Sequence, residues 1–213
     1  MRLALFVIGI GLFVLFSHAC GGDDNDNDND VESDDDDDGQ DPDDDADLCS
    51  DQEFIGGTWE DVSTGLLWQT GRSCDRRRYG AAEEYCDVLT LGNFSDWRLP
   101  TISELRSLVR GCAATMAGGD CAATDECYDS ESCENDSCVG CSYGKGPNEW
   151  CYGAEELDAP CGWFWSSTPR SNTTENRWCL RYESGGVGSC ETGDDSEGGD
   201  LGHLVRCVRS SVE

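Results

Sequence analysis

The chain has 213 residues, with 45 Asp and Glu against 14 Lys and Arg, a formal net charge of −31, and 15 cysteines. A charge of this sign and size argues against binding nucleic acid or anionic sugars through electrostatic attraction alone. The cysteine content argues against a cytosolic location, where thiols are kept reduced. The sequence therefore predicts an exported protein whose folded part is cross-linked by disulfide bonds.

Residues 1–19 are predicted to be a signal peptide. Arg2 supplies a positive charge, residues 4–16 form an apolar run, and the small residues Ser17 and Ala19 occupy the positions that a signal peptidase inspects. The apolar run is shorter than the roughly 20 residues that a spanning helix needs. This length favours cleavage over retention of the segment as a membrane anchor.

Cys20 follows the predicted cleavage point, and the other fourteen cysteines lie between Cys49 and Cys207, where they could form seven bridges. A leftover cysteine in an exported protein needs an explanation. Cys20 with its following glycines resembles the lipid-carrying cysteine of bacterial lipoproteins, so we predict a lipid anchor at Cys20 and attachment to the outer membrane or cell surface. Ser17 departs from that motif, which usually has Leu there; the alternative is a free N-terminal thiol on a periplasmic or secreted chain.

Residues 20–48 are predicted to be an acidic, disordered tether. Positions 23–48 hold sixteen acidic residues, no basic one and almost no apolar side chain, so they cannot bury enough surface to offset the entropy of ordering. Such a tether reaches at most about 90–100 Å. Asp alternates with Asn over residues 23–30, but the turn Gly and closing Glu of an EF-hand loop are missing. Whether calcium binds this tether stays open.

Residues 49–213 form the predicted folded domain. They carry twenty-nine acidic residues against thirteen basic ones, a net charge of −16. Residues 58–62 and 66–68 predict a hairpin with a short turn. Residues 79–91 predict a helix because one face gathers apolar side chains, namely Ala82, Tyr85, Cys86 and Leu89.

Thr101 and Glu104 predict the start of a second helix, because each can hydrogen-bond the backbone amide of the other in a capping box. Leu105, Leu108 and Val109 supply its buried face, and Gly111 is the predicted end.

Residues 112–161 show no regular pattern and contain eight cysteines, so this cysteine-rich segment is predicted to be an irregular insertion held by four internal bridges. Zinc is the alternative use for these cysteines. Only one C-x-x-C occurs, at Cys138 and Cys141, and we therefore predict no metal site. Strands are predicted at 163–167, in a hairpin of 177–182 and 187–190, and at 203–209, with Trp163 and Trp165 on one face.

Four short motifs occur in order along residues 54–209: Thr64-Gly65-Leu66-Leu67-Trp68-Gln69, Asp96-Trp97-Arg98-Leu99-Pro100-Thr101 with Glu104-Leu105, Trp165-Ser166-Ser167-Thr168, and Val205-Arg206-Cys207-Val208-Arg209. Together they resemble the Lcl C-terminal domain family, named for a bacterial collagen-like adhesin. The resemblance implies an α+β fold of the C-type-lectin kind, with two helices beside a small antiparallel sheet and a long loop region. It also implies two bridges, Cys86 with Cys207 and Cys179 with Cys190.

The resemblance favours a binding or adhesion module with a glycan or protein ligand, over a structural coat or spacer protein. Calcium-binding lectins of this fold use motifs that residues 147–149 and 176–178 do not match, so no calcium site and no cofactor are predicted. Trp163 and Trp165 are expected in the core rather than stacked on a sugar. The arginines at 72, 76, 77 and 78 are expected to be a solvated cluster.

An enzyme is the less favoured alternative. The formylglycine-generating enzymes, distant relatives by fold, need free cysteines and a metal ion. His203 is the one histidine left after signal-peptide cleavage, and it lies in a predicted strand. No catalytic triad, phosphate-binding loop or metal triad occurs, so no catalytic residue is predicted.

Overall fold

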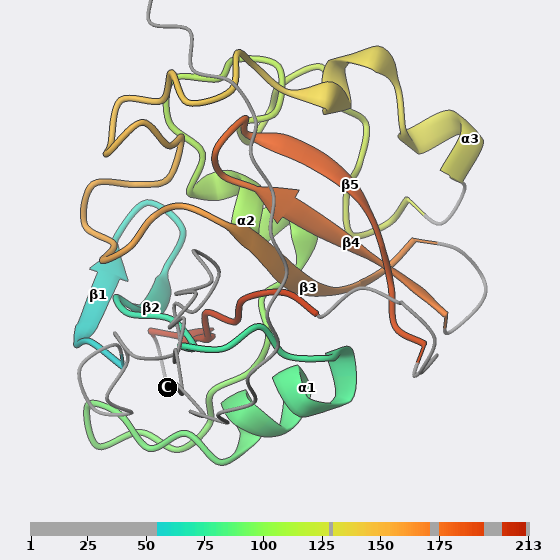
Figure 1. Ribbon diagram of the computed structural model, residues 1–213. Coiled ribbons are helices and arrows are strands. Elements are labelled where there is room, and N and C mark those ends of the chain that lie inside the picture. Colours follow the sequence, from blue (N-terminus) through green and yellow to red (C-terminus); the bar gives the residue numbers. More distant parts are fainter. Residues whose placement is uncertain (1–54, 128–129, 171–174, 194–201, 212–213) are drawn as a thin grey trace, which may run out of the picture. The chain divides into compact units, whose positions relative to one another are not determined.

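The computed structural model describes residues 55–127, 130–170, 175–193 and 202–211 (Figure 1). Residues 1–54, which include the predicted signal peptide, Cys20 and the whole predicted acidic tether, lie outside the described residues. Among the described residues, no helix is long and apolar enough to cross a membrane.

The first antiparallel sheet contains the predicted N-terminal hairpin. Strands β1 (Thr58–Asp61) and β2 (Leu66–Gln69) pair, and β6 (Val208–Ser210) adds to the other side of β2. The prediction of a hairpin here is confirmed.

The second antiparallel sheet has the order β3-β4-β5, with β3 at Trp163–Pro169, β4 at Asn176–Arg181 and β5 at Gly186–Glu191. The predicted hairpin is confirmed as β4 and β5, and its turn needs Gly185, whose φ is +66°. The α+β class is confirmed. The expected single small sheet is wrong, because the strands form two separate three-stranded sheets.

The predicted closing strand at 203–209 is also shorter than expected. Only residues 208–210 form a strand, while His203 and Leu204 make isolated bridges to Arg77 and Phe164. The segment passes between the two sheets and pairs briefly with a different partner at each point. It therefore links the sheets rather than extending one of them.

Helices α1 (Tyr79–Asp87) and α2 (Ile102–Ser107) are present but shorter than predicted. After α1, Trp97 donates its indole N–H to the carbonyl oxygens of Leu91 and Phe94, at 3.3 and 3.2 Å, which stabilises a turn. After α2, the amide of Arg110 donates to the Tyr152 carbonyl at 2.7 Å. A local turn therefore follows α1 and a contact with the distant Tyr152 follows α2, and both helices end earlier than periodicity indicates.

The two helices pack against opposite faces of the β3-β4-β5 sheet (Figure 1). Alternation along β3 places Phe164 in the larger core cluster with Ile102 and Leu105 of α2, and Trp165 in the second cluster with Ala82 of α1. The predicted division of the β3 side chains between two faces is confirmed.

Among its described residues, the cysteine-rich segment contains two short helical turns, α3 (Ser130–Cys133) and η2 (Asp136–Val139). The predicted four internal bridges are confirmed; they join Cys112 to Cys141, Cys121 to Cys138, Cys127 to Cys133, and Cys151 to Cys161. Disulfide bonds at this density place the domain in an oxidising, non-cytoplasmic compartment.

Arg106 of α2 holds the first part of this segment. Its buried guanidinium donates to the carbonyl oxygens of Thr115, Met116, Gly119 and Ala123. Irregular backbone has no sheet or helix partner for these oxygens, so the arginine supplies the missing donors. Burial lowers the pKa of Arg106.

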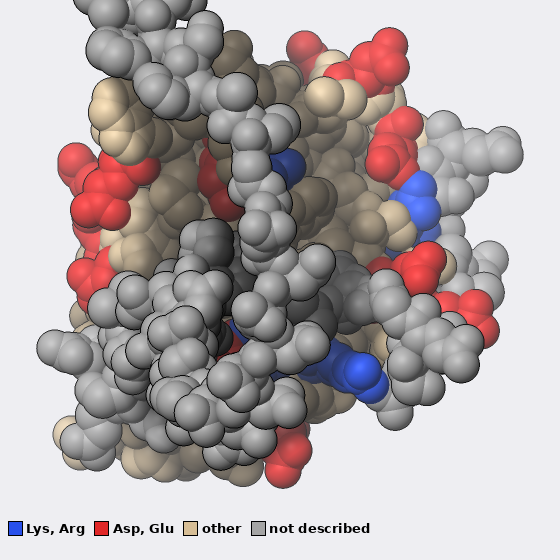
Figure 2. All heavy atoms as spheres, viewed as in Figure 1, with Lys and Arg blue, Asp and Glu red and all other residues tan. Residues whose placement is uncertain are grey.

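Acidic side chains lie around the rim of the face drawn in Figure 2, while basic side chains are fewer and lie apart from one another. This distribution agrees with the domain's net charge of −16 over residues 49–213. Long-range attraction of a polyanion to this face is therefore not expected.

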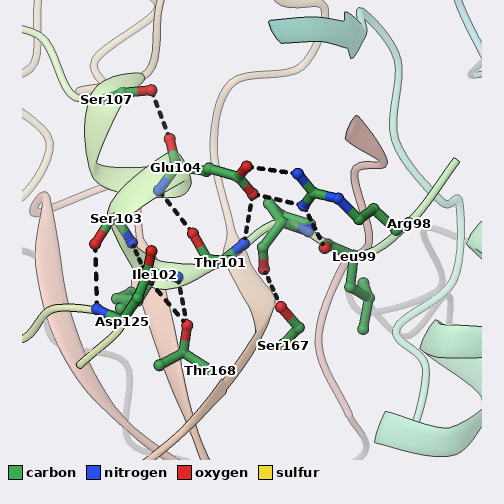
Figure 3. Close-up of polar contacts among 11 residues, drawn as sticks. Arg98, Leu99, Thr101, Ile102, Ser103, Glu104, Ser107, Asp125, Ser167 and Thr168 are labelled. Atoms are coloured by element: carbon green, nitrogen blue, oxygen red, sulfur yellow. Dashed lines mark hydrogen bonds and ion pairs between the residues drawn. The ribbon is translucent and has the colours of Figure 1, made fainter. Parts of the chain in front are cut away.

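The N-terminus of α2 is capped by side chains from three segments (Figure 3). The amide of Glu104 donates to Thr101 Oγ1 at 3.2 Å, and the amide of Thr101 donates to Glu104 Oε2 at 2.8 Å, which confirms the capping box. The Ile102 amide donates to Thr168 Oγ1 at 2.9 Å, and the Ser103 amide to Asp125 Oδ1 at 3.0 Å. Glu104 also pairs with Arg98, which raises the pKa of that arginine.

Replacing Thr101 by Ala should lower the free energy of unfolding by about 0.5–2 kcal/mol, because the Glu104 amide loses its acceptor. Thr101→Ser keeps the hydroxyl and is the matched control, with a much smaller change expected. Denaturant unfolding under oxidising conditions measures both. Equal stability of the Ala variant and the wild type would show that the capping box contributes nothing.

Candidate functional site

A pocket of about 490 Å³ opens at the β3-β4-β5 sheet. We call it the aromatic–arginine pocket. Its lining comes from the segment before α1, the cysteine-rich segment, the three strands with their flanking residues, and the segment before β6. The lining residues are Arg76, Tyr143, Gly162, Trp163, Arg181, Glu183, Ser189, Cys190, His203 and Leu204. Aromatic walls with a few polar groups are typical of small-ligand sites.

A second hollow, of about 300 Å³, is the competing candidate. Its lining is Arg110, Pro147, Asn148, Gly153, Glu155 and Glu156. This lining has no aromatic ring, and two carboxylates oppose one arginine. The aromatic–arginine pocket is larger and has a more varied chemistry, so it is the better candidate.

Strand pairing brings the central side chains of the pocket together. Trp163 of β3 and Arg181 of β4 are direct cross-strand partners, so both side chains leave the same face of the sheet. The indole of Trp163 reaches across β4 to β5, where a Cβ at Gly188 would lie 3.6 Å from the ring, an ordinary van der Waals distance.

Tyr143 comes to the pocket from the cysteine-rich segment. The amides of Cys141 and Gly144 donate to the carbonyl oxygens of Ser184 and Glu183, at 2.7 and 2.8 Å, which fixes the segment against the β4–β5 turn. The bridge from Cys141 to Cys112 holds the same stretch from its other side. Tyr143 is thus held in place while its side chain stays 60% exposed.

Arg181 is held by ring faces rather than by hydrogen bonds. Its Cζ lies 4.6 Å from the Tyr143 centroid and 5.5 Å from the Trp163 centroid. Its Nε lies 3.7 Å from Glu183 Oε2, which is an ion pair too long for a hydrogen bond. Within the described residues, neither of these two atoms has a hydrogen-bond partner. The Nε is buried, whereas the side chain as a whole is 36% exposed, so an acceptor from a ligand would meet the terminal N–H groups of the guanidinium.

Arg206 shows the opposite arrangement. It is 1% exposed, and its guanidinium donates to the carbonyl oxygens of Gln69, Thr70, Asp158 and Ala159. Burial lowers the pKa of Arg206 to about 10, which leaves it a cation at neutral pH. Its two terminal nitrogens are committed to the fold and only its buried Nε lacks a partner among the described residues, so Arg206 is a scaffold residue.

His203 forms the inner wall of the pocket and is 7% exposed. Its ring stacks on Trp163, with centroids 5.7 Å apart, and meets Trp165 edge-on at 4.6 Å. The expectation of a largely buried scaffold histidine agrees with this packing. The expected strand around it is replaced by a single bridge to Arg77.

The two predicted tryptophans differ in position. Trp165 is 1% exposed, lies in the core and donates its indole N–H to the Arg77 carbonyl at 2.6 Å, as the prediction of core packing requires. Trp163 is half-buried and lines the pocket, so the same prediction is wrong for this residue in part. Its position at the start of β3, beside the open pocket mouth, is the reason.

The predicted arginine cluster is divided by the fold. Arg76 and Arg78 are exposed, as expected for a solvated cluster, but Arg76 also lines the pocket. Arg77 lies over the Tyr85 ring at 4.9 Å, and Arg72 donates to the Ser73 carbonyl at 3.0 Å. Only one arginine of the four reaches the candidate site.

The structure contains both bridges that the family resemblance implies. Cys86 of α1 is bonded to Cys207 beside β6, and Cys179 of β4 to Cys190 of β5. Cys74 is also disulfide-bonded, to a cysteine outside the described residues.

The sulfur atoms of Cys179 and Cys190 lie within 4.8 Å of a His203 ring nitrogen, a spacing that could suit a metal ion. Both sulfurs are bonded to each other, however, so neither is a thiolate ligand in this state.

Three pocket residues, Tyr143, Arg181 and Glu183, carry no sequence signal of their own. Tyr143 lies in an irregular segment, Arg181 is the last residue of β4, and Glu183 lies in the turn after it. The residues that face a strand cannot be known before its partner strands are. Alternation places Arg181 on one face of β4, but only strand pairing shows that Trp163 is its neighbour.

The family model of the Lcl C-terminal domain matches residues 57–209 of the chain. No curated protein and no solved structure matches the chain.

Replacement by Gln should reduce stability strongly at Arg206 and only slightly at Arg181. Arg206→Gln leaves buried carbonyl oxygens unpaired and should lower the free energy of unfolding by about 3 kcal/mol or more. Arg181→Gln removes a partly exposed ion pair and should change it by at most about 1 kcal/mol. Denaturant unfolding compares the two. A similar loss for both variants would mean that Arg181 is part of the scaffold.

Proposed function

The chain belongs to the Lcl C-terminal domain family, and from this membership we propose that it is a bacterial envelope lipoprotein that displays a binding or adhesion module. The aromatic–arginine pocket is the ligand site of that module. The observation that carries the proposal is Arg181, whose guanidinium lies against two rings with no hydrogen bond to the described residues. An arginine held in this way at an open pocket is suited to a ligand rather than to the fold.

The sequence supports the attachment of this module to a membrane. A lipid on Cys20 would anchor the chain at the outer membrane or cell surface, and the acidic residues that follow would repel one another and extend as a spacer. The domain would then be presented away from the bilayer to a glycan or protein ligand. Nucleic acid is not a proposed partner, because the domain carries a net charge of −16.

A C-type-lectin-like arrangement is part of the proposal. Two helices, antiparallel strands and a long stapled loop support it. The sequence does not match the calcium motifs of lectins of this fold, so ligand binding is proposed to be independent of calcium.

We do not propose an enzyme. All described cysteines are in disulfide bonds, whereas formylglycine-generating relatives need free thiols. A structural coat or spacer protein is the second candidate, favoured by the dense cross-linking and the long acidic tether. A coat protein would need no pocket with uncommitted hydrogen-bond donors.

The detergent-solubilised full chain should bind a subset of glycans or surface proteins on an array, with the same pattern in calcium and in chelator. Trp163→Ala should remove that binding, while Trp150→Ala, which changes an exposed ring outside the pocket lining, should not. Array silence from a well-folded protein would favour the coat candidate. Binding that survives Trp163→Ala would place the ligand site elsewhere.

Mass spectrometry of the N-terminal peptide from membranes should show a diacylglycerol on Cys20 and a bond between Cys49 and Cys74. The reason is parity, since Cys20 and Cys49 are the two cysteines outside the described residues and Cys74 has one partner there. Cys20→Ser should release the protein from the membrane. An unmodified Cys20, or one bonded to Cys74, would remove the anchor.

A further inference from the structure

We propose that the aromatic–arginine pocket recognises a sugar residue that bears a single carboxylate, with Arg181 pairing the carboxylate and Trp163 contacting the sugar ring. This inference rests on the proposed function and adds the chemical class of the ligand. Hexuronic acids and sialic acids share this chemistry.

The arginines provide the first argument. Seven guanidinium groups of the domain are committed elsewhere: Arg106, Arg110 and Arg206 donate to carbonyl oxygens, Arg72 does so within its own turn, and Arg98, Arg170 and Arg209 pair with carboxylates. The Arg181 side chain makes no hydrogen bond with the described residues: it faces the rings of Tyr143 and Trp163, and the carboxylate of Glu183 lies 3.7 Å from its Nε, beyond hydrogen-bond distance. Arg77 and Arg177 also lie over tyrosine rings with an Nε that has no hydrogen-bond partner among the described residues, but neither lines the pocket. A guanidinium edge presents paired N–H groups that match a carboxylate in a bidentate arrangement.

The aromatic rings provide the second argument. Trp163 is half-buried against the sheet and stacked on His203, so its orientation is fixed before a ligand arrives. Tyr143 adds an exposed ring on the side of the cysteine-rich segment. A rigid aromatic surface suits the C–H face of a sugar, and preorganisation lowers the entropy cost of binding.

The remaining lining favours a sugar over a peptide. Around the two rings lie Arg76, Glu183 and Ser189, which can bond hydroxyl groups, and Leu204 is the one aliphatic chain of the lining. An aliphatic peptide side chain would find Leu204 as its one aliphatic neighbour, whereas the hydroxyl groups of a sugar find several polar partners.

The charge of the pocket and of the domain limits how many anionic groups the ligand can carry. The arginines and carboxylates of the pocket are Arg76 and Arg181 against Glu183, a formal charge of +1, whereas the domain carries −16. A densely sulfated chain would meet the repulsion of the whole domain. A ligand with one carboxylate interacts mainly with the two arginines of the pocket. Its binding should therefore depend only weakly on salt concentration.

The test uses the detergent-solubilised full chain and matched probes by calorimetry or biolayer interferometry. Tri-galacturonate is compared with its methyl ester, and sialyllactose with lactose, so that each pair differs by the carboxylate. Arg181→Gln is compared with Arg78→Gln, which removes an exposed arginine of the same charge that does not line the pocket. Near-ultraviolet circular dichroism establishes that each variant is folded.

The expected result is binding of at least one acidic sugar at least about tenfold more tightly than its neutral partner, with that preference lost in Arg181→Gln and kept in Arg78→Gln. Which acidic sugar binds identifies the source of the carboxylate. Equal binding of acid and neutral partner, sensitive to Trp163→Ala, overturns the carboxylate assignment but leaves the pocket as a ligand site. A heparin fragment serves as the polyanionic probe: if it alone binds, and both arginine variants weaken its binding equally, the carboxylate assignment is overturned in favour of diffuse charge. If no acidic sugar binds but another ligand from the array binds in the pocket, the carboxylate assignment is overturned and the proposed function stands.

Discussion

The first turn of α2 is where three segments distant in sequence are fixed to one another. A helix leaves its first amide groups without partners inside the helix. Here Thr101, Thr168 and Asp125 accept from three of those amides, and they come from the loop before α2, from β3 and from the cysteine-rich segment. Capping the helix therefore also positions the sheet and the insertion. The fold depends on this junction because α2 is only six residues long and would not be stable alone.

The motifs by which the family is recognised belong mainly to this scaffold. The second motif supplies Arg98 and Thr101 to the junction, the third supplies Thr168, and the fourth supplies Arg206, whose two terminal nitrogens donate to backbone carbonyl oxygens. The pocket draws instead on Tyr143, Arg181 and Glu183, which lie outside every motif. A family can keep the junction and change the pocket, which is consistent with one fold serving different ligands.

The cysteine-rich segment shows how an irregular chain can build part of a site. It has little regular structure, yet four bridges, the Arg106 guanidinium and backbone bonds to the β4–β5 turn fix its course. Tyr143 is held at the pocket by these constraints and remains exposed. Loops fixed on a rigid scaffold are common places for binding residues, because their side chains are not needed for the core.

The sequence by itself determined the hairpins, the Thr101 capping box, the two faces of β3 and the need for four bridges between residues 112 and 161, because each depends on neighbours in the chain or on parity. The sequence motifs also identified the family, and the match of the family model to residues 57–209 establishes the membership. Only the tertiary structure decided which cysteines of the insertion pair, where α1 and α2 end, and that the strands form two sheets. It alone placed Trp163 beside Arg181 and Tyr143, since strand partners and loop paths are set by packing and cross-links between residues far apart in sequence.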